Sequence, residues 1–172
     1  MEIIKASLTL DGSSITLDVP FVKVDEEKRL VSGFATLDNL DSQGDIVTQE
    51  ASMKAFKNFR GNIREMHQPK AVGKIVDYRS DHYIDKASGE VYNGIYVSAY
   101  ISKGASDTWE KVLDGTLSGF SIGGELKKSE PLFSEKADSI HRKISEYDLV
   151  ELSLVDNPAN KFANVLVIQK SD

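Results

Sequence analysis

Hydrophobic and polar residues alternate along most of the chain. Eight segments show this period of two, or a short continuous apolar run, at the length of a strand: residues 6–10, 14–24, 29–37, 71–79, 91–101, 116–126, 147–155 and 163–169. The segments between them, such as DGSS, DSQGD, DKASGE and DNPAN, are rich in turn-forming residues. The pattern therefore predicts a mainly β (α+β) fold of about eight strands.

Two segments have helical spacing instead. In TQEASMKAFKNFRG we expect Thr48 to cap a helix that ends near Gly61, and in SDTWEKVLDG we expect Ser106 to cap a helix that ends at Gly115. The second helix should bury Trp109, Val112 and Leu113. The charged stretch KKSEPLFSEKADSIHRK lacks any period and predicts a long surface loop.

Composition narrows the class of protein. The chain has 172 residues, 40% of them hydrophobic and 28% charged, which is typical of one soluble globular domain. No linker or repeat divides it, so residues 1–172 are expected to form a single domain. The net charge of -6 argues against nucleic acid as a partner, and zero cysteines exclude a disulfide scaffold and a thiolate nucleophile. With neither a secretory signal nor a membrane span in the pattern, we expect a cytoplasmic protein.

The segment LSGFSIGGEL holds the most informative candidate. On a strand, Ser121 shares one face with Gly119 and Gly123. Glycine weakens a strand interior, so its repeated use indicates that another group, such as a substrate, approaches the backbone there. An ordinary strand serine beside a bulge explains the segment equally well.

A nucleophilic serine needs a base, and the chain has three histidines. His67 stands in a loop at the entry to a strongly patterned strand, where it can face an open cleft. His82 and His141 lie in polar or charged stretches. Each of the three, taken alone, is more often a surface histidine than a catalytic base.

A carboxylate usually orients the histidine. Glu151 interrupts the apolar run of YDLVELSLV, where an ionised carboxylate needs a partner. A structural ion pair with Lys or Arg is the alternative explanation. Asp148 and Asp156, at the ends of the same run, are the other candidates.

Three segments in this order, MHQPKAVGKI, SGFSIGGE and ELSLVDNPAN, resemble the prohead protease family of tailed bacteriophages. GFATLDNLDSQGDIV followed by a helix also resembles that family, so the similarity runs from about Val31 to Val165. It implies a closed or partly closed β-barrel of seven to eight mostly antiparallel strands with two or more flanking helices, similar to the herpesvirus assembly protease.

The resemblance also implies roles for individual residues. Ser121 matches the family's serine nucleophile and His67 its histidine, and the third position is carried to Glu151. His141 is an alternative, because the herpesvirus relatives use a second histidine there. Ser121 is followed by Ile, Gly and Gly, whereas the family commonly has an aromatic residue after the first Gly. The oxyanion or substrate would be bound by N–H groups near Gly123 and Gly124, or by a cation such as Arg142.

The implied function is a serine endopeptidase of prohead maturation. Its substrates would be the scaffold and major capsid proteins and the protease itself, inside the immature capsid in the host cell cytoplasm. The mechanism needs no cofactor or metal, and analogy with the herpesvirus enzymes implies a homodimer. Neither nucleic acid nor a membrane is expected as a partner.

Two other functions fit parts of the sequence. Residues 119–123 spell G-x-S-x-G, the nucleophile elbow of α/β-hydrolases, but that motif requires a helix directly after the serine. A non-enzymatic β-barrel, serving as a virion structural or binding module, would use the same glycines at a barrel corner. That alternative predicts no hydrogen bond between Ser121 and His67.

Overall fold

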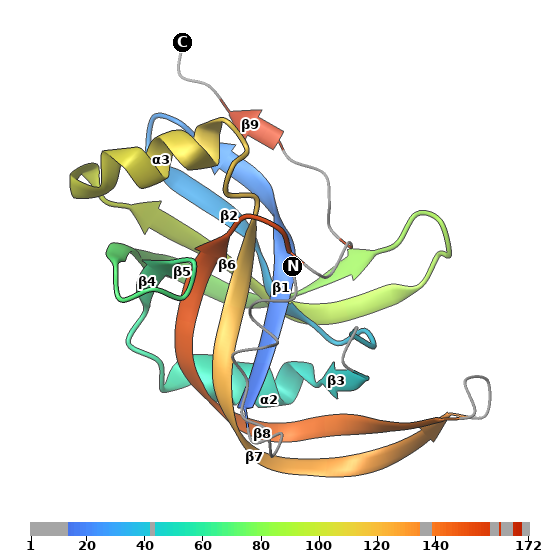
Figure 1. Cartoon of the computed structure of the whole chain (residues 1–172). Coiled ribbons are helices and arrows are strands. Elements are labelled where there is room, and N and C mark those ends of the chain that lie inside the picture. Colours follow the sequence, from blue (N-terminus) through green and yellow to red (C-terminus); the bar gives the residue numbers. More distant parts are fainter. Residues whose placement is uncertain (1–13, 42–43, 135–138, 159–161, 163–166, 170–172) are drawn as a thin grey trace.

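The computed structural model describes residues 14–41, 44–134, 139–158, 162 and 167–169 (Figure 1). Its strands are β1 (Ser14–Asp25), β2 (Leu30–Leu37), β3 (Asp45–Val47), β4 (Asn62–Glu65), β5 (Ala71–Ile84), β6 (Val91–Ile101), β7 (Gly119–Ser134), β8 (Ser139–Val155) and β9 (Val167–Gln169). Its helices are α2 (Gln49–Lys57), the short 3-10 helix η1 (Lys103–Ala105) and α3 (Ser106–Leu113).

Seven strands close into a barrel in the order β2-β6-β5-β4-β8-β7-β1, and β1 pairs again with β2. Neighbours in this ring are antiparallel except β4 and β8, which are parallel. β3 adds in parallel to β8 and β9 adds in parallel to β1. The prediction of a closed, mainly β barrel with two flanking helices is therefore confirmed.

The barrel interior is filled by every second residue of its strands. Phe120 and Ile122 of β7 and Leu152 and Leu154 of β8 are fully buried in one hydrophobic cluster. Burying an apolar side chain of this size contributes about 1.5–3 kcal/mol. Because side chains alternate between the two faces of a strand, the residues between these positions face away from the core. The intervening Ser121 thus lies on the outer face.

Helix α2 begins as predicted and ends earlier than predicted. The N–H group of Ala51 donates to Thr48 Oγ1 at 3.1 Å, which is the expected N-cap. The helix ends at the C-cap Asn58, and Gly61, with a φ of 88°, instead forms the turn into β4. Phe56 is buried in the core. In Figure 1, α2 and α3 lie near opposite ends of the barrel.

The predicted cap of the second helix is wrong. Ser106 is the first residue of α3, and its Oγ donates to Lys103 O at 3.0 Å. The capping side chain is Ser102, which accepts from Gly104 N at 3.0 Å at the start of η1. The 3-10 turn therefore supplies the helix start, so no cap is needed at Ser106. Trp109 and Val112 are buried as predicted, Leu113 is half-buried, and Gly115 follows the helix with a φ of 84°.

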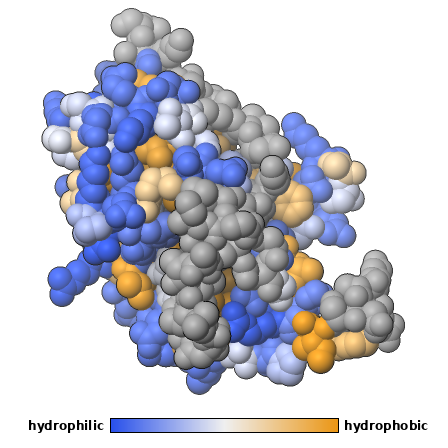
Figure 2. Space-filling view, viewed as in Figure 1, coloured by the Kyte–Doolittle hydropathy of each residue, from blue (hydrophilic) through white to orange (hydrophobic). Residues whose placement is uncertain are grey.

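The predicted surface loop at 127–143 is also wrong. β7 runs on to Ser134 and β8 starts at Ser139, so the two strands form a ribbon that extends beyond the barrel (Figure 1). Phe133 and Ile140 on this ribbon are 62% and 72% exposed, and orange apolar surface lies near its tip in Figure 2. Since neither face of the ribbon is buried, its sequence lacks the alternation that marks a strand.

Two predicted strands fall largely outside the described residues. Residues 6–10 lie there entirely, and of 163–169 only β9 is described. The sequence pattern missed β3 and β4, which have three and four residues. Strands this short carry too few positions to show a period.

Candidate active site

Ser121 lies in the middle of the barrel wall. β7 runs between β1 and β8, and the residues opposite Ser121 are Asp18 on β1 and Ser153 on β8. All three are buried, and Ser121 has 0% exposure. The outer face of the barrel thus holds a row of polar side chains, whereas the neighbouring residues Phe120 and Ile122 point into the apolar core.

His67 stands in the tight turn between β4 and β5. Met66 and His67 both have positive φ angles, 51° and 58°. The Met66 N–H donates to Leu154 O at 2.9 Å, and the Gln68 N–H donates to Glu65 O at 2.9 Å. Because β4 lies parallel to β8, this turn reaches the part of β8 that faces Ser121. His67 Nε2 is 2.9 Å from Ser121 Oγ.

Glu151, on β8, holds the other side of the imidazole. Its Oε1 contacts His67 Nδ1 and accepts a hydrogen bond from Ser153 Oγ at 3.2 Å. Its Oε2 lies 3.5 Å from Arg64 Nη1. The ion pair with an arginine and the contact with histidine, which the sequence presented as alternatives, therefore occur together.

The surroundings of Glu151 lower its pKa below the ordinary value. Burial acts in the opposite direction and raises the pKa. The hydrogen bond and charge of His67, the hydroxyl of Ser153 and the charge of Arg64 outweigh that effect. The carboxylate is consequently held in its ionised form.

These contacts form a chain from carboxylate to imidazole to hydroxyl. When the Nδ1 proton of His67 points to Glu151, Nε2 accepts the hydrogen bond from the Ser121 hydroxyl. This is the arrangement that activates a serine for attack on a carbonyl. The hydrogen bond between Ser121 and His67 is also the contact that a non-enzymatic barrel was expected to lack.

The other candidates for the third position lie elsewhere. His141 is ten positions before Glu151 on β8, about 30 Å away along an extended strand. Asp148 pairs with Lys127 at 3.5 Å. Asp156 follows β8, and its carbonyl accepts from Ser118 Oγ at 3.0 Å. Within the described residues, Glu151 is the carboxylate that contacts the His67 ring.

Two further residues weighed from the sequence are also remote from Ser121. Arg142, considered for the oxyanion, forms a two-pronged ion pair with Asp45, with both N to O distances at 2.9 Å. His82 is exposed and lies beside Asp81, with 3.7 Å between His82 Nδ1 and Asp81 Oδ1. Among the described residues, a cation that does lie at the site is Arg64.

The glycines around Ser121 make room for neighbouring side chains and backbone. A Cβ on Gly123 would be 3.0 Å from Glu151 Cγ, and one on Gly119 would be 2.6 Å from the backbone oxygen of Val19 and 2.7 Å from Pro158 Cγ. A Cβ on Gly124 would be 2.9 Å from Tyr147 Cδ2. The group that approaches the backbone at Gly123 is thus Glu151 rather than a substrate. Binding of an oxyanion near Gly123 and Gly124 stays a prediction.

The structure agrees with the rejection of the α/β-hydrolase elbow, because no helix directly follows Ser121. A nucleophile elbow turns sharply from a strand into a helix at its serine. Here β7 continues from Gly119 to Ser134 without such a turn. The G-x-S-x-G spelling is therefore a coincidence of sequence.

Sequence reasoning missed Ser153 and Arg64. Ser153 accepts from the His67 N–H at 3.1 Å and donates to Glu151. Its position two residues after Glu151 could have placed both on one face of a strand. Arg64 lies on the four-residue strand β4, which the sequence pattern did not reveal.

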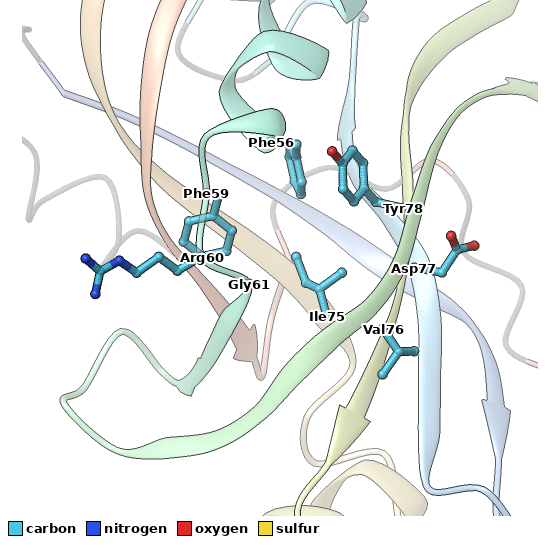
Figure 3. Close-up of a pocket in the computed structure, with 8 residues that line it drawn as sticks. All are labelled: Phe56, Phe59, Arg60, Gly61, Ile75, Val76, Asp77 and Tyr78. Atoms are coloured by element: carbon cyan, nitrogen blue, oxygen red, sulfur yellow. The ribbon is translucent and has the colours of Figure 1, made fainter.

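An open pocket of about 280 Å³ lies at the start of β4, away from His67. Figure 3 shows four apolar or aromatic side chains that gather around it, while Arg60 and Asp77 point outward; the four are Phe56, Phe59, Ile75 and Tyr78. Neither Ser121 nor Glu151 lines this pocket.

The described part of the chain lacks both a metal-binding cluster and a membrane-spanning helix. It contains no group of three or more His, Cys, Asp or Glu residues arranged to hold a metal ion. None of its helices has the length and apolar character needed to cross a membrane.

Comparison with known proteins places the chain beside a described family. A family model described as "Putative phage serine protease XkdF" matches residues 18–130, which is more than half of the chain. The matched range contains Ser121 and His67 and ends before Glu151. No curated protein and no solved structure matches the chain.

Proposed function

The chain belongs to the phage serine protease XkdF family, and from this membership we propose that it is a serine endopeptidase with Ser121 as nucleophile, His67 as general base and Glu151 as the carboxylate that orients His67. The observation that carries the proposal is the continuous contact from Glu151 through His67 to Ser121 Oγ. A serine hydroxyl that is held by a histidine and a carboxylate in this way can act as a nucleophile, whereas a serine with a purely structural role cannot.

The proposed reaction has two stages. His67 Nε2 takes the hydroxyl proton while Ser121 Oγ attacks the peptide carbonyl carbon, and the carbonyl oxygen becomes an oxyanion. The intermediate collapses when the C–N bond breaks and His67 gives its proton to the leaving amine. Water then attacks the acyl-enzyme with His67 again as base, which releases the new carboxyl terminus and restores Ser121.

Glu151 supports this cycle electrostatically. It fixes the tautomer of His67 and stabilises the imidazolium that forms after proton transfer. We further propose that N–H groups near Gly123 and Gly124 stabilise the oxyanion. The β7–β8 register shifts between these two glycines, and such an irregularity can free an N–H group from the ladder.

The proposed substrates are the scaffold and major capsid proteins of a phage prohead, together with the protease itself. The support is the phage origin of the matched family and the prohead protease motifs around His67, Ser121 and Glu151. On this proposal the enzyme acts inside the immature capsid in the host cell cytoplasm, and forms a homodimer as the herpesvirus enzymes do.

The first experiment compares Ser121→Ala with Ser118→Ala. Ser118 is a matched control, because its hydroxyl binds the Asp156 carbonyl and not His67. Each protein is treated with a fluorophosphonate probe and is also co-expressed with its capsid and scaffold proteins. Since Ser121 has 0% exposure, a substrate reaches it only after neighbouring groups move, so the assay includes assembling proheads as well as a free peptide.

We expect Ser121→Ala to fold normally, to take up no probe and to leave the capsid proteins uncut, a loss of about 10⁴-fold or more. Ser118→Ala should retain both activities. Unchanged processing by Ser121→Ala would overturn the assignment.

A further inference from the structure

Ser153 connects the Glu151 carboxylate, which holds the His67 ring, to the main chain of the turn. Its side chain has 0% exposure and makes two hydrogen bonds. Its Oγ accepts from the His67 N–H at 3.1 Å and donates to Glu151 Oε1 at 3.2 Å. One hydroxyl therefore touches both the backbone of the histidine and the carboxylate that holds its ring.

The turn that carries His67 needs such support. Positive φ angles at residues other than glycine cost about 1–2 kcal/mol each, and here two occur in succession, at Met66 and His67. A conformation of this kind persists only where its surroundings hold it. β8 does so twice, because Leu154 O accepts the Met66 N–H and Ser153 Oγ accepts the His67 N–H.

The same hydroxyl constrains Glu151. Ser153 Oγ and His67 Nδ1 share the carboxylate oxygen Oε1, which leaves Oε2 directed to Arg64. Ser153 also lies directly opposite Ser121 in the β7–β8 ladder. Rotation of the carboxylate would break the Ser153 bond, so the hydroxyl favours the rotamer that faces His67.

We propose that Ser153 is a positioning residue of the active centre, which fixes the His67 backbone and the Glu151 carboxylate relative to one another and so sets the approach of His67 Nε2 to Ser121 Oγ. This inference rests on the proposed function. Ser153 acts through its neighbours and takes no part in bond making, and an error of about 1 Å in such a position can cost about 10²-fold in rate.

The test compares Ser153→Ala and Ser153→Cys with Ser145→Ala. Cysteine keeps the approximate shape of serine but forms weaker hydrogen bonds. Ser145 is the matched control, because it lies on the same strand and its Oγ donates to Lys128 O at 3.4 Å, on the ribbon. The readouts are the rate of fluorophosphonate labelling, kcat and KM on a peptide, and the low-field proton NMR signal of the His67 Nδ1–H.

We expect Ser153→Ala to lose about 10–100-fold in labelling rate and kcat with KM nearly unchanged, and its low-field signal to shift or broaden. Ser153→Cys should fall between Ser153→Ala and the original protein, and it replaces Ser153→Ala if that variant does not fold. Ser145→Ala should behave as the original protein in every readout.

Wild-type labelling and an unshifted signal in both Ser153 variants would overturn the inference. A loss of labelling rate and kcat that merely matches the fraction of unfolded protein would also overturn it. A chain that no phosphonate labels even with Ser153 intact would instead contradict the proposed function. In that case the His67 signal still decides whether Ser153 positions the pair of His67 and Glu151.

Discussion

The Glu151 carboxylate is a half-buried charge, and its polar partners compensate for the loss of water. Taking a carboxylate out of water is costly unless its oxygens find donors or cations. Glu151 Oε1 has His67 and Ser153, and Oε2 has Arg64 within 3.5 Å. The same contacts keep an ionised carboxylate beside the His67 ring.

A dependence of stability on pH follows from these contacts. The pKa of Glu151 is lower in the folded protein than its ordinary value, because His67, Ser153 and Arg64 outweigh the effect of burial. Because this pKa is lower in the folded protein, ionised Glu151 stabilises the fold. The stabilisation is complete above the unfolded pKa of about 4.3 and is lost as the pH falls through the folded pKa.

We therefore expect the free energy of unfolding of the original protein to fall more steeply, as the pH drops below about 5, than that of Glu151→Gln, which cannot ionise. Urea unfolding at a series of pH values measures both. Glu125→Gln, an exposed glutamate on β7, is the control and should follow the original protein. Parallel curves for Glu151→Gln and the original protein would contradict the prediction.

The sequence pointed to some residues of the site and not to others. Ser121 stood out because of its glycines, His67 because it precedes a patterned strand, and Glu151 because it interrupts an apolar run. Ser153 and Arg64 carry no such mark, since their importance depends on which strands become neighbours. A pattern within one segment cannot report a contact between β8 and the turn after β4.

The turn that carries His67 is also tied to helix α3. Glu65, at the end of β4, is buried and accepts from Thr108 Oγ1 at 2.8 Å. Lys70, at the start of β5, lies 3.5 Å from Glu65 and 2.6 Å from Asp107. Lys111 lies 3.4 Å from Glu65 as well. Both ends of the turn are thus anchored on one face of α3.

We expect Thr108→Val, which keeps the shape of the side chain and removes its hydroxyl, to destabilise the protein by about 1–3 kcal/mol, because the buried Glu65 carboxylate loses a donor. Urea unfolding measures this change, and the labelling rate of Ser121 should fall with it if the turn loosens. Thr116→Val, at an exposed position after α3, should change stability by less than about 0.5 kcal/mol. Equal effects of the two substitutions would refute the role of this anchor.

At the level of elements, periodicity predicted those strands and helices that bury one face in the core. The long barrel strands and both helices were found this way, with errors of a few residues at their ends. The outer ribbon of β7 and β8 was not found, because its residues have no core to face. β3 and β4 were too short to show a period, yet β4 is the strand that brings His67 to Ser121.

Closure of the barrel assembles the site from distant parts of the chain. His67 is 54 residues from Ser121 and 84 from Glu151. The parallel pairing of β4 with β8 and the antiparallel pairing of β8 with β7 place them on adjacent strands. In the sequence, only the resemblance to prohead proteases connected these segments.

The ribbon beyond the barrel is expected to contribute little to its stability. Past Glu125, β7 has no pairing with β1 among the described residues, so here β7 pairs with β8 alone. The exposed tip residues Phe133 and Ile140 add no burial that the barrel needs. Leu132 and His141 face each other in the ladder and can be joined by a two-residue turn.

We expect a chain in which Asn-Gly replaces residues 133–140 to keep a cooperative thermal transition within about 3 °C of the original and to label at Ser121 at the original rate. Gly94→Ala provides the contrast inside the barrel wall, because its Cβ would lie 1.8 Å from Thr36 O and force two paired strands apart. That substitution should lower the transition temperature by several degrees, in line with the strain of overpacking. Differential scanning calorimetry measures both proteins. A shortened ribbon that abolishes cooperative unfolding would show that the barrel and the ribbon form one stability unit.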